Sequence, residues 1–285
     1  KIKGLTAARL KQMSSVRGKL RRISSNLRQM QDLGGCRAIL PSIDNASSLV
    51  NAIRNGFSHE LKREDSYMDE PRSSGYRSHH LVFAFCPRNA EEEPFRGRLI
   101  ELQIRSRLQH CWATAVEAVG MYRNENMKAG LGDASWLRLF ELMSLEFALS
   151  EGRKYAQGER SERISEIAQI AGDLQAEQTL NALSHAVTGL DRFDVSPNNK
   201  PRYCHIEYFH RTNQVSVRLL DGPSKIGGAL DELELPSDRS SNKSSVVVEL
   251  DKIENLRKAY PNYFGDVQLF TKNLSEVVHG GRARE

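Results

Sequence analysis

Apolar and polar residues alternate along residues 98–105, and this alternation is the most informative pattern in the chain. Successive side chains of a β-strand point to opposite faces of its sheet. One face of the predicted strand would therefore pack into the core, through Ile100, Leu102 and Ile104. The other face would carry an acid, an amide and a guanidinium, from Glu101, Gln103 and Arg105. Such a strand is suited to holding a polar ligand.

The same reasoning assigns further elements to the first part of the chain. A basic helix is predicted over residues 5–31, and further helices over 45–57 and 107–122. Short apolar runs predict strands at 36–40 and 80–85. The polar stretch 58–74 and the acidic stretch 87–97 are interpreted as loops.

Helical periodicity dominates residues 136–190, and the pattern changes after a turn-rich linker at 194–201. A hairpin is predicted from strands at 203–209 and 214–220, a polar loop at 237–245, another strand at 246–250, and a short helix at 251–260. These changes divide the chain into three predicted domains: 1–130, a helical extension at 131–195, and a small α+β unit at 196–285. The predicted class is α/β (α+β): a mixed, mostly antiparallel sheet of about five strands flanked by helices.

Composition adds limits on compartment and partners. The 285 residues carry a net charge of +5, because 41 basic residues exceed 36 acidic ones, which mildly favours polyanionic partners. No apolar run approaches the roughly 18 residues of a membrane span. The four cysteines are Cys36, Cys86, Cys111 and Cys204. They are far apart and have apolar or aromatic neighbours, so they are predicted to be buried free thiols, and a cytoplasmic location is predicted for the protein.

Two carboxylates and a row of cations suggest phosphoryl or pyrophosphoryl transfer. Asp32 and Glu101 offer hard oxygen ligands for Mg²⁺. The basic segment spaces several phosphate-binding side chains at helical intervals, namely Arg9, Lys11, Ser15, Lys19 and Arg22. A solvated charged helix face is the alternative interpretation of that segment.

Residues 71–80 contain groups suited to a second nucleotide. Tyr76 offers a flat face for a base, and Arg72 and His80 offer contacts to phosphate oxygens. An ordinary polar loop is the alternative. His110 is expected either to contact a base edge or to cap a layer of the core, whereas Trp112 is expected in the core.

Four motifs together resemble the synthetase domain of the RelA/SpoT family, the (p)ppGpp synthetases. They occur in the family's order over about the first 125 residues: the basic row 9–22, Met30 to Arg37, Ser74 to Leu81, and Glu101 to Ser106. The resemblance is strongest to stand-alone small alarmone synthetases and toxin-like members. It implies a nucleotidyltransferase-like fold.

The resemblance also implies an activity: transfer of the β,γ-pyrophosphate of ATP to the 3′-hydroxyl of an acceptor nucleotide. Asp32 would hold Mg²⁺. Glu101 would either share this metal or accept the proton of the acceptor 3′-hydroxyl. The basic row would bind ATP. The acceptor would contact the following residues: Arg72, Tyr76, His80, Gln103, Arg105 and His110.

GTP or GDP is the expected acceptor. Toxin-like relatives provide an alternative, in which the acceptor is an adenine nucleotide or the 3′ end of tRNA. A second alternative is an inactive nucleotide-binding regulator. None of the eight histidines is followed by Asp, the dipeptide of the family's hydrolase domain, so hydrolysis of the product is not expected. A homo-oligomer is compatible with the sequence, and no membrane partner is expected.

Overall fold

The structure is a computed structural model, and it describes residues 5–10, 34–68, 71–123, 125–153, 158–189, 203–209, 214–220, 243–249 and 263–284. The described residues form two compact units. The first comprises the chain up to residue 110 together with 151–153, and the second comprises 111–150 and the described residues from 158 to 284. The functional domain boundaries inferred from the sequence stay predictions.

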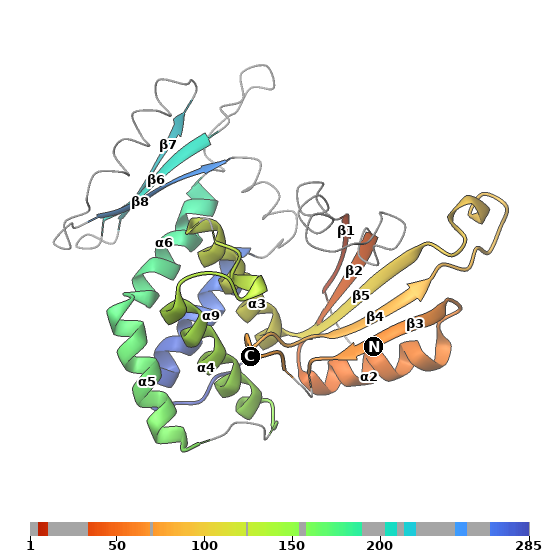
Figure 1. Cartoon of the computed structure of the whole chain (residues 1–285), viewed down its shortest axis with the longest axis horizontal. Coiled ribbons are helices and arrows are strands. Elements are labelled where there is room, and N and C mark those ends of the chain that lie inside the picture. Colours follow the sequence, from red (N-terminus) through yellow and green to blue (C-terminus); the bar gives the residue numbers. More distant parts are fainter. Residues whose placement is uncertain are drawn as a thin grey trace. The chain divides into compact units, whose positions relative to one another are not determined.

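A five-stranded mixed sheet is the centre of the first unit (Figure 1). Its strands, in spatial order, are β1 (Leu5–Leu10), β2 (Gly34–Leu40), β5 (Leu99–Ser106), β4 (His79–Ala84) and β3 (Glu60–Ser66). Only β2 and β5 run parallel, and the other three pairs are antiparallel. This arrangement confirms the predicted mixed, mostly antiparallel sheet.

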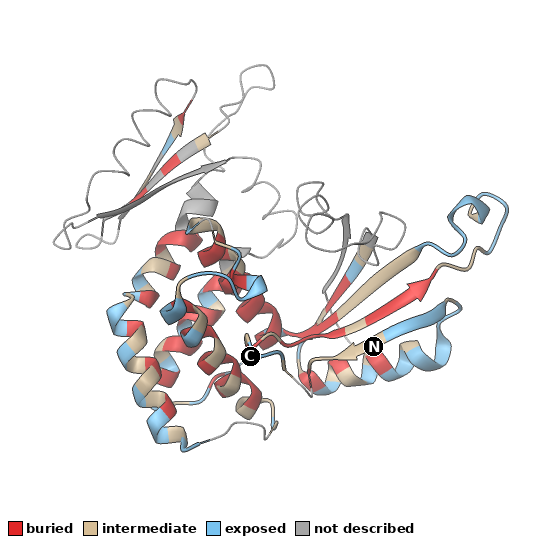
Figure 2. Cartoon of the chain, viewed as in Figure 1, coloured by how far each residue is buried: buried red, intermediate tan, exposed pale blue. Residues whose placement is uncertain are grey.

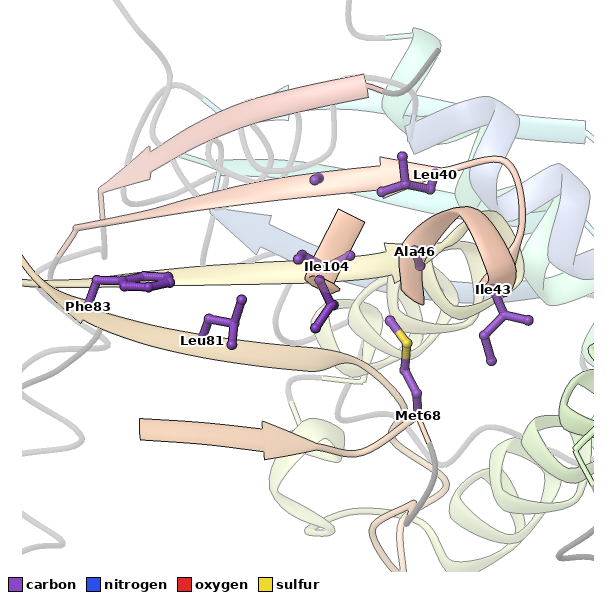
Figure 3. Close-up of a cluster of buried hydrophobic side chains, with 9 residues drawn as sticks. Leu40, Ile43, Ala46, Met68, Leu81, Phe83 and Ile104 are labelled. Carbon is purple, nitrogen blue, oxygen red and sulfur yellow. The ribbon is translucent and has the colours of Figure 1, made fainter. Parts of the chain in front are cut away.

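Helix α2 (Ile43–Gly56) covers one face of this sheet and closes its core. The helix begins after Ser42, whose hydroxyl accepts a hydrogen bond from the Asn45 N–H at 3.2 Å. Figure 3 shows the cluster of buried side chains between helix and sheet. Its members come from α2, from strands β2, β4 and β5, and from Met68, which follows β3. The labelled side chains are Leu40, Ile43, Ala46, Met68, Leu81, Phe83 and Ile104. Ile104 is fully buried there, as its place on the apolar face of β5 predicted.

Gly35 allows β2 to lie close to β5 beside Glu101. The two residues are partners in the parallel register, and a Cβ added at Gly35 would lie 2.9 Å from the Glu101 carbonyl oxygen. We expect Gly35→Ala to lower the free energy of unfolding by about 1–3 kcal/mol, because the strands must separate locally. Urea denaturation measures this change. Gly56→Ala is the matched control, since nothing lies within 4 Å of the added methyl; equal stability of the two variants would contradict the steric argument.

Two elements of the first unit differ from the sequence prediction. Residues 5–10 form strand β1 rather than helix, because they pair antiparallel with β2 from Leu5↔Ile39 to Leu10↔Gly34. The rest of the predicted helix, 11–31, lies outside the described residues. Strand β3 occupies part of the stretch interpreted as a loop. It pairs only with β4, and its first half is exposed, so it lacks the apolar alternation that predicts a strand.

Figure 2 shows how burial follows this topology: β4 is mostly buried, whereas much of β3 and the loop between β4 and β5 are exposed. That loop contains a short 3₁₀ turn, η2 (Glu93–Phe95). Cys36 is exposed, contrary to the predicted burial, because it lies near the start of β2 beyond Ala38 and Leu40, which pack with α2. Cys86 is partly buried, Cys111 is buried, and all three of these thiols are free.

The second unit is mainly helical, with a small sheet. Its helices are α3 (Arg107–Tyr122), which begins in the first unit, then α4 (Ala134–Ser150), α5 (Arg160–Asp173), α6 (Ala176–Gly189) and α9 (Tyr263–Val278). A 3₁₀ turn, η3 (Met127–Ala129), precedes α4. The aromatic core joins three helices: the Trp112 indole donates to the Phe140 carbonyl at 2.7 Å, and the Phe140 and Phe270 rings lie 5.6 Å apart. The core position expected for Trp112 is therefore confirmed.

The small sheet has the order β7-β6-β8, and all its pairs are antiparallel. Strands β6 (Tyr203–Phe209) and β7 (Gln214–Leu220) form the predicted hairpin. Strand β8 (Lys243–Glu249) begins before the predicted strand, because its first residues continue the pairing with Phe209 and Tyr208. The predicted linker at 194–201 and helix at 251–260 lie outside the described residues. None of the helices in the described parts of the chain has the length and apolar character needed to cross a membrane.

Candidate active site

Glu101 is held from two sides on the polar face of β5. One of its carboxylate oxygens lies 2.8 Å from His80 Nδ1, and the other accepts a hydrogen bond from Gln103 Nε2 at 2.9 Å. His80 stands opposite Gln103 in the antiparallel pair of β4 and β5, so both partners come from adjacent strand positions. The Glu101 side chain keeps 18% of its surface exposed. The carboxylate is therefore oriented by the sheet and still open to a ligand.

A chain of hydrogen bonds extends from this carboxylate to Tyr76 and Arg105. The Tyr76 hydroxyl lies 2.8 Å from His80 Nε2 and accepts a hydrogen bond from an Arg105 terminal nitrogen at 2.7 Å. Arg105 also donates to Gln103 Oε1 at 3.3 Å and is almost fully buried. Alternation along β5 and the β4 pairing thus assemble one polar cluster on the sheet face opposite α2. We call Glu101, His80, Gln103, Tyr76 and Arg105 the β5 polar cluster.

The electrostatics of the β5 polar cluster shift the pKa values of two members. Burial alone would raise the pKa of Tyr76, but the positive charge of Arg105, the charge of His80 and their hydrogen bonds outweigh it and lower this pKa to about 7. Burial alone would lower the pKa of His80, but the hydrogen bond and negative charge of Glu101, with the contribution of Tyr76, raise it overall. The cluster therefore favours a charged imidazole and a readily ionised phenol.

In the protein without ligands, we expect one tyrosine to ionise near pH 7, far below the ordinary value of about 10. Phenolate absorbance in the near ultraviolet, compared between wild type and Tyr76→Phe, measures this ionisation. The unfolded chain binds the Tyr76 proton more tightly than the folded chain does, so stability relative to Tyr76→Phe rises with pH between about 7 and about 10 and is lost below that window. Identical titration curves would contradict the assignment.

A second tyrosine, Tyr67, connects Arg72 to the β5 polar cluster. Its guanidinium carbon is 4.4 Å from the centre of the Tyr67 ring, and it donates to the Tyr67 hydroxyl at 2.7 Å. The Tyr67 ring packs edge-on against His80, with centroids 5.4 Å apart. Sequence reasoning did not select Tyr67, because it follows an edge strand that was interpreted as a loop. An aromatic residue shortly before the loop that carries Arg72 was the available signal.

A buried carboxylate lies behind the two segments that supply Tyr76 and Arg105. Glu151 forms an ion pair with Arg77 at 2.5 Å, and both side chains are 2% exposed. Glu151 also accepts hydrogen bonds from the Ser106 hydroxyl and, at 3.5 Å, from Gln109 Nε2. Ser106 and Gln109 cap the start of α3 reciprocally, through bonds of 3.2 and 3.3 Å. Glu151 is 45 residues beyond Ser106, so no local pattern could reveal this contact.

The remaining predicted site residues have mixed positions. His110 is 2% exposed within α3, and its proposed contact with a base stays a prediction. Arg9 belongs to β1, and its backbone position pairs with Gly35 on β2. Gly35 in turn pairs with Glu101 on β5. The other residues of the basic row and the second predicted metal ligand lie outside the described residues: Lys11, Ser15, Lys19, Arg22 and Asp32.

Glu101 is a suitable oxygen ligand for a hard cation such as Mg²⁺, because it is a carboxylate that is partly exposed and already oriented. Among the residues that the structure describes, no group of three or more His, Cys, Asp or Glu side chains is placed to hold a metal ion. The pairing of Glu101 with Asp32 as metal ligands stays a prediction.

Comparison with known protein families identifies the part of the chain that contains this cluster as a known region. Residues 8–127 match the family described as "Region found in RelA / SpoT proteins". This segment is therefore a RelA/SpoT region, and the resemblance inferred from the four motifs is confirmed. The match includes β2, β4, β5 and the whole β5 polar cluster.

Parts of this chain are also similar to individual known proteins. The GTP pyrophosphokinase YjbM of Bacillus subtilis (strain 168) is 27% identical over 157 residues, which cover 54% of this chain and 72% of the relative. Two solved structures are similar over part of the chain. The small alarmone synthetase 1 of Bacillus subtilis, bound to its product pppGpp, is 22% identical, with a TM-score of 0.46 and coverage of 53% of this chain and 75% of that chain. A GTP pyrophosphokinase family protein of Streptococcus pneumoniae is 20% identical, with a TM-score of 0.44 and coverage of 63% and 80%.

Proposed function

We propose that this protein is a pyrophosphokinase that transfers the β,γ-pyrophosphate of ATP to the 3′-hydroxyl of GTP or GDP and so makes (p)ppGpp. The observation that carries the proposal is the oriented, partly exposed Glu101 carboxylate beside Tyr76, within a segment that matches the RelA/SpoT family. The name of the relative YjbM, a GTP pyrophosphokinase, supports the guanine nucleotide as acceptor.

In this proposal Glu101 accepts the proton of the acceptor 3′-hydroxyl or binds the metal beside it. His80 and Gln103 fix the direction of its two oxygens, so the carboxylate does not need to reorganise when the acceptor binds. Mg²⁺, held by Glu101 and Asp32, would neutralise charge on the migrating group. The row of Arg9, Lys11, Ser15, Lys19 and Arg22 would bind ATP.

The acceptor would lie against Tyr76 and its neighbours. A nucleobase stacks on an aromatic face, and Arg72 next to Tyr67 offers a cation for the acceptor phosphates. His80, with its raised pKa, and the guanidinium of Arg105 add positive charge to the same face. His110 completes the proposed set. The clustering of these cations suits a nucleotide that carries several phosphates.

The test is transfer of label from γ-labelled ATP by the purified protein with Mg²⁺. GTP, GDP, ATP and bulk tRNA are offered separately, and products are separated by thin-layer chromatography. Labelled guanosine tetra- or pentaphosphate is the expected result. Label in an adenine nucleotide or in tRNA would replace the guanine acceptor with the toxin-like alternative, and transfer to none of the four would overturn the pyrophosphokinase proposal.

A further inference from the structure

Strand β5 meets the residues just before β4 where the β5 polar cluster is completed. We call the side that carries this cluster the front. Tyr76 and Ser78 point to the front, where both are hydrogen-bonded to Arg105 at 2.7 and 3.4 Å. Arg77 lies between Tyr76 and Ser78 in the sequence, and its side chain pairs with Glu151 instead. On β5, Ser106 follows Arg105, and its side chain points to the opposite face of the strand.

Both of these rear-facing residues bind one carboxylate. The Glu151 carboxylate pairs with Arg77 at 2.5 Å and accepts a hydrogen bond from the Ser106 hydroxyl. One side chain therefore ties together the backbone positions next to Tyr76 and next to Arg105. The side chains of Arg77 and Glu151 are each 2% exposed, so water screens this ion pair very little.

We propose that Glu151 is a positioning residue that holds Tyr76 and Arg105 in hydrogen-bonding register from behind, a role that rests on the proposed function for its catalytic consequence. A buried ion pair contributes little net stability compared with apolar packing, so we assign this pair the role of placing its two partners relative to each other, together with the Ser106 hydrogen bond to Glu151. Removing the Glu151 charge breaks its ion pair with buried Arg77 and loosens the link between the Tyr76 segment and β5.

The first measurement does not depend on catalysis. In Glu151→Gln the Arg105–Tyr76 contact loosens, so the ionisation of Tyr76, followed by phenolate absorbance against the same variant with Tyr76→Phe, moves upward from about pH 7. Glu141→Gln is the matched control, because Glu141 is a carboxylate on α4 paired with Arg138 on the exposed surface. The control is expected to titrate as the wild type does.

The second measurement is kinetic. We expect Glu151→Gln to raise the KM for the acceptor by about 10- to 100-fold, since misplacement of a positioning group is costly. The KM for ATP should change little, because Glu151 binds Arg77 and Ser106, the chain neighbours of Tyr76 and Arg105, which are assigned to the acceptor. A role in folding alone would lower the stability without this split between the two substrates.

A second variant keeps the proposal testable if Glu151→Gln fails to fold. Arg77→Met combined with Glu151→Met removes both charges and replaces them with apolar packing, which buried pairs commonly tolerate. If either variant folds and retains both the Tyr76 ionisation and the acceptor KM of the wild type, the positioning role is overturned. If the wild type transfers label to no acceptor, the proposed function fails, and the Tyr76 titration still decides the role of Glu151.

Discussion

Glu101→Gln is expected to lower the rate of pyrophosphate transfer by about 10²- to 10⁴-fold while the protein stays folded. Glutamine has almost the same shape as glutamate, and its amide oxygen can still accept one of the two hydrogen bonds, so the fold of β5 is preserved. The variant loses the negative charge, and with it the capacity to accept a proton or to bind a divalent cation strongly. Transfer of label from ATP under saturating substrate measures the effect.

The matched control for this variant is Glu93→Gln. Glu93 is a glutamate on the exposed loop between β4 and β5, where it pairs with Arg96. Glu93→Gln should retain the wild-type rate, because among the described residues neither Glu93 nor Arg96 bonds to a member of the β5 polar cluster. Thermal unfolding of both variants checks that folding is unaffected. Near-normal turnover in folded Glu101→Gln would show that the site assignment is wrong.

Tyr76→Ala is expected to raise the KM for the acceptor by about tenfold or more, because a base stacked on an aromatic ring contributes about 1–3 kcal/mol. The KM for ATP should stay close to that of the wild type. Tyr76→Phe separates the two properties of this side chain. It keeps the ring for stacking but loses the hydroxyl that joins His80 to Arg105.

The phenylalanine variant should therefore bind the acceptor better than the alanine variant and more weakly than the wild type. Initial rates measured over a matrix of ATP and acceptor concentrations give both KM values for each protein. If Tyr76→Ala weakened the use of ATP and acceptor equally, Tyr76 would have a general structural role rather than the proposed acceptor contact.

Elements with a strong local pattern were predicted well from the sequence. The alternation in 98–105 identified β5 and both of its faces, and α3 begins and ends at the predicted residues, Arg107 and Tyr122. The hairpin of β6 and β7 also has its predicted bounds. In β5 the apolar residues repeat at the period of a strand, so hydrophobic packing and local geometry favour the same structure.

Strands β3 and β1 were not predicted from the sequence. Strand β3 consists mainly of charged residues, and β1 continues directly into a basic segment with helical spacing. Their strand conformation depends on hydrogen bonds to β4 and β2, partners that are distant in sequence. Pairing at a sheet edge satisfies backbone groups whatever the side chains are, so the side-chain pattern carries little information about it.

The sequence by itself determined the chemistry of this protein: a carboxylate, an amide and a guanidinium alternate along one strand, within four motifs that identify a RelA/SpoT region. Only the tertiary structure decided how these groups are joined. The β4–β5 register places His80 between Glu101 and Tyr76, and Glu151 arrives from far along the chain to bind behind them. Residue types follow from local sequence, whereas contacts between distant segments depend on strand register and packing, which no local pattern encodes.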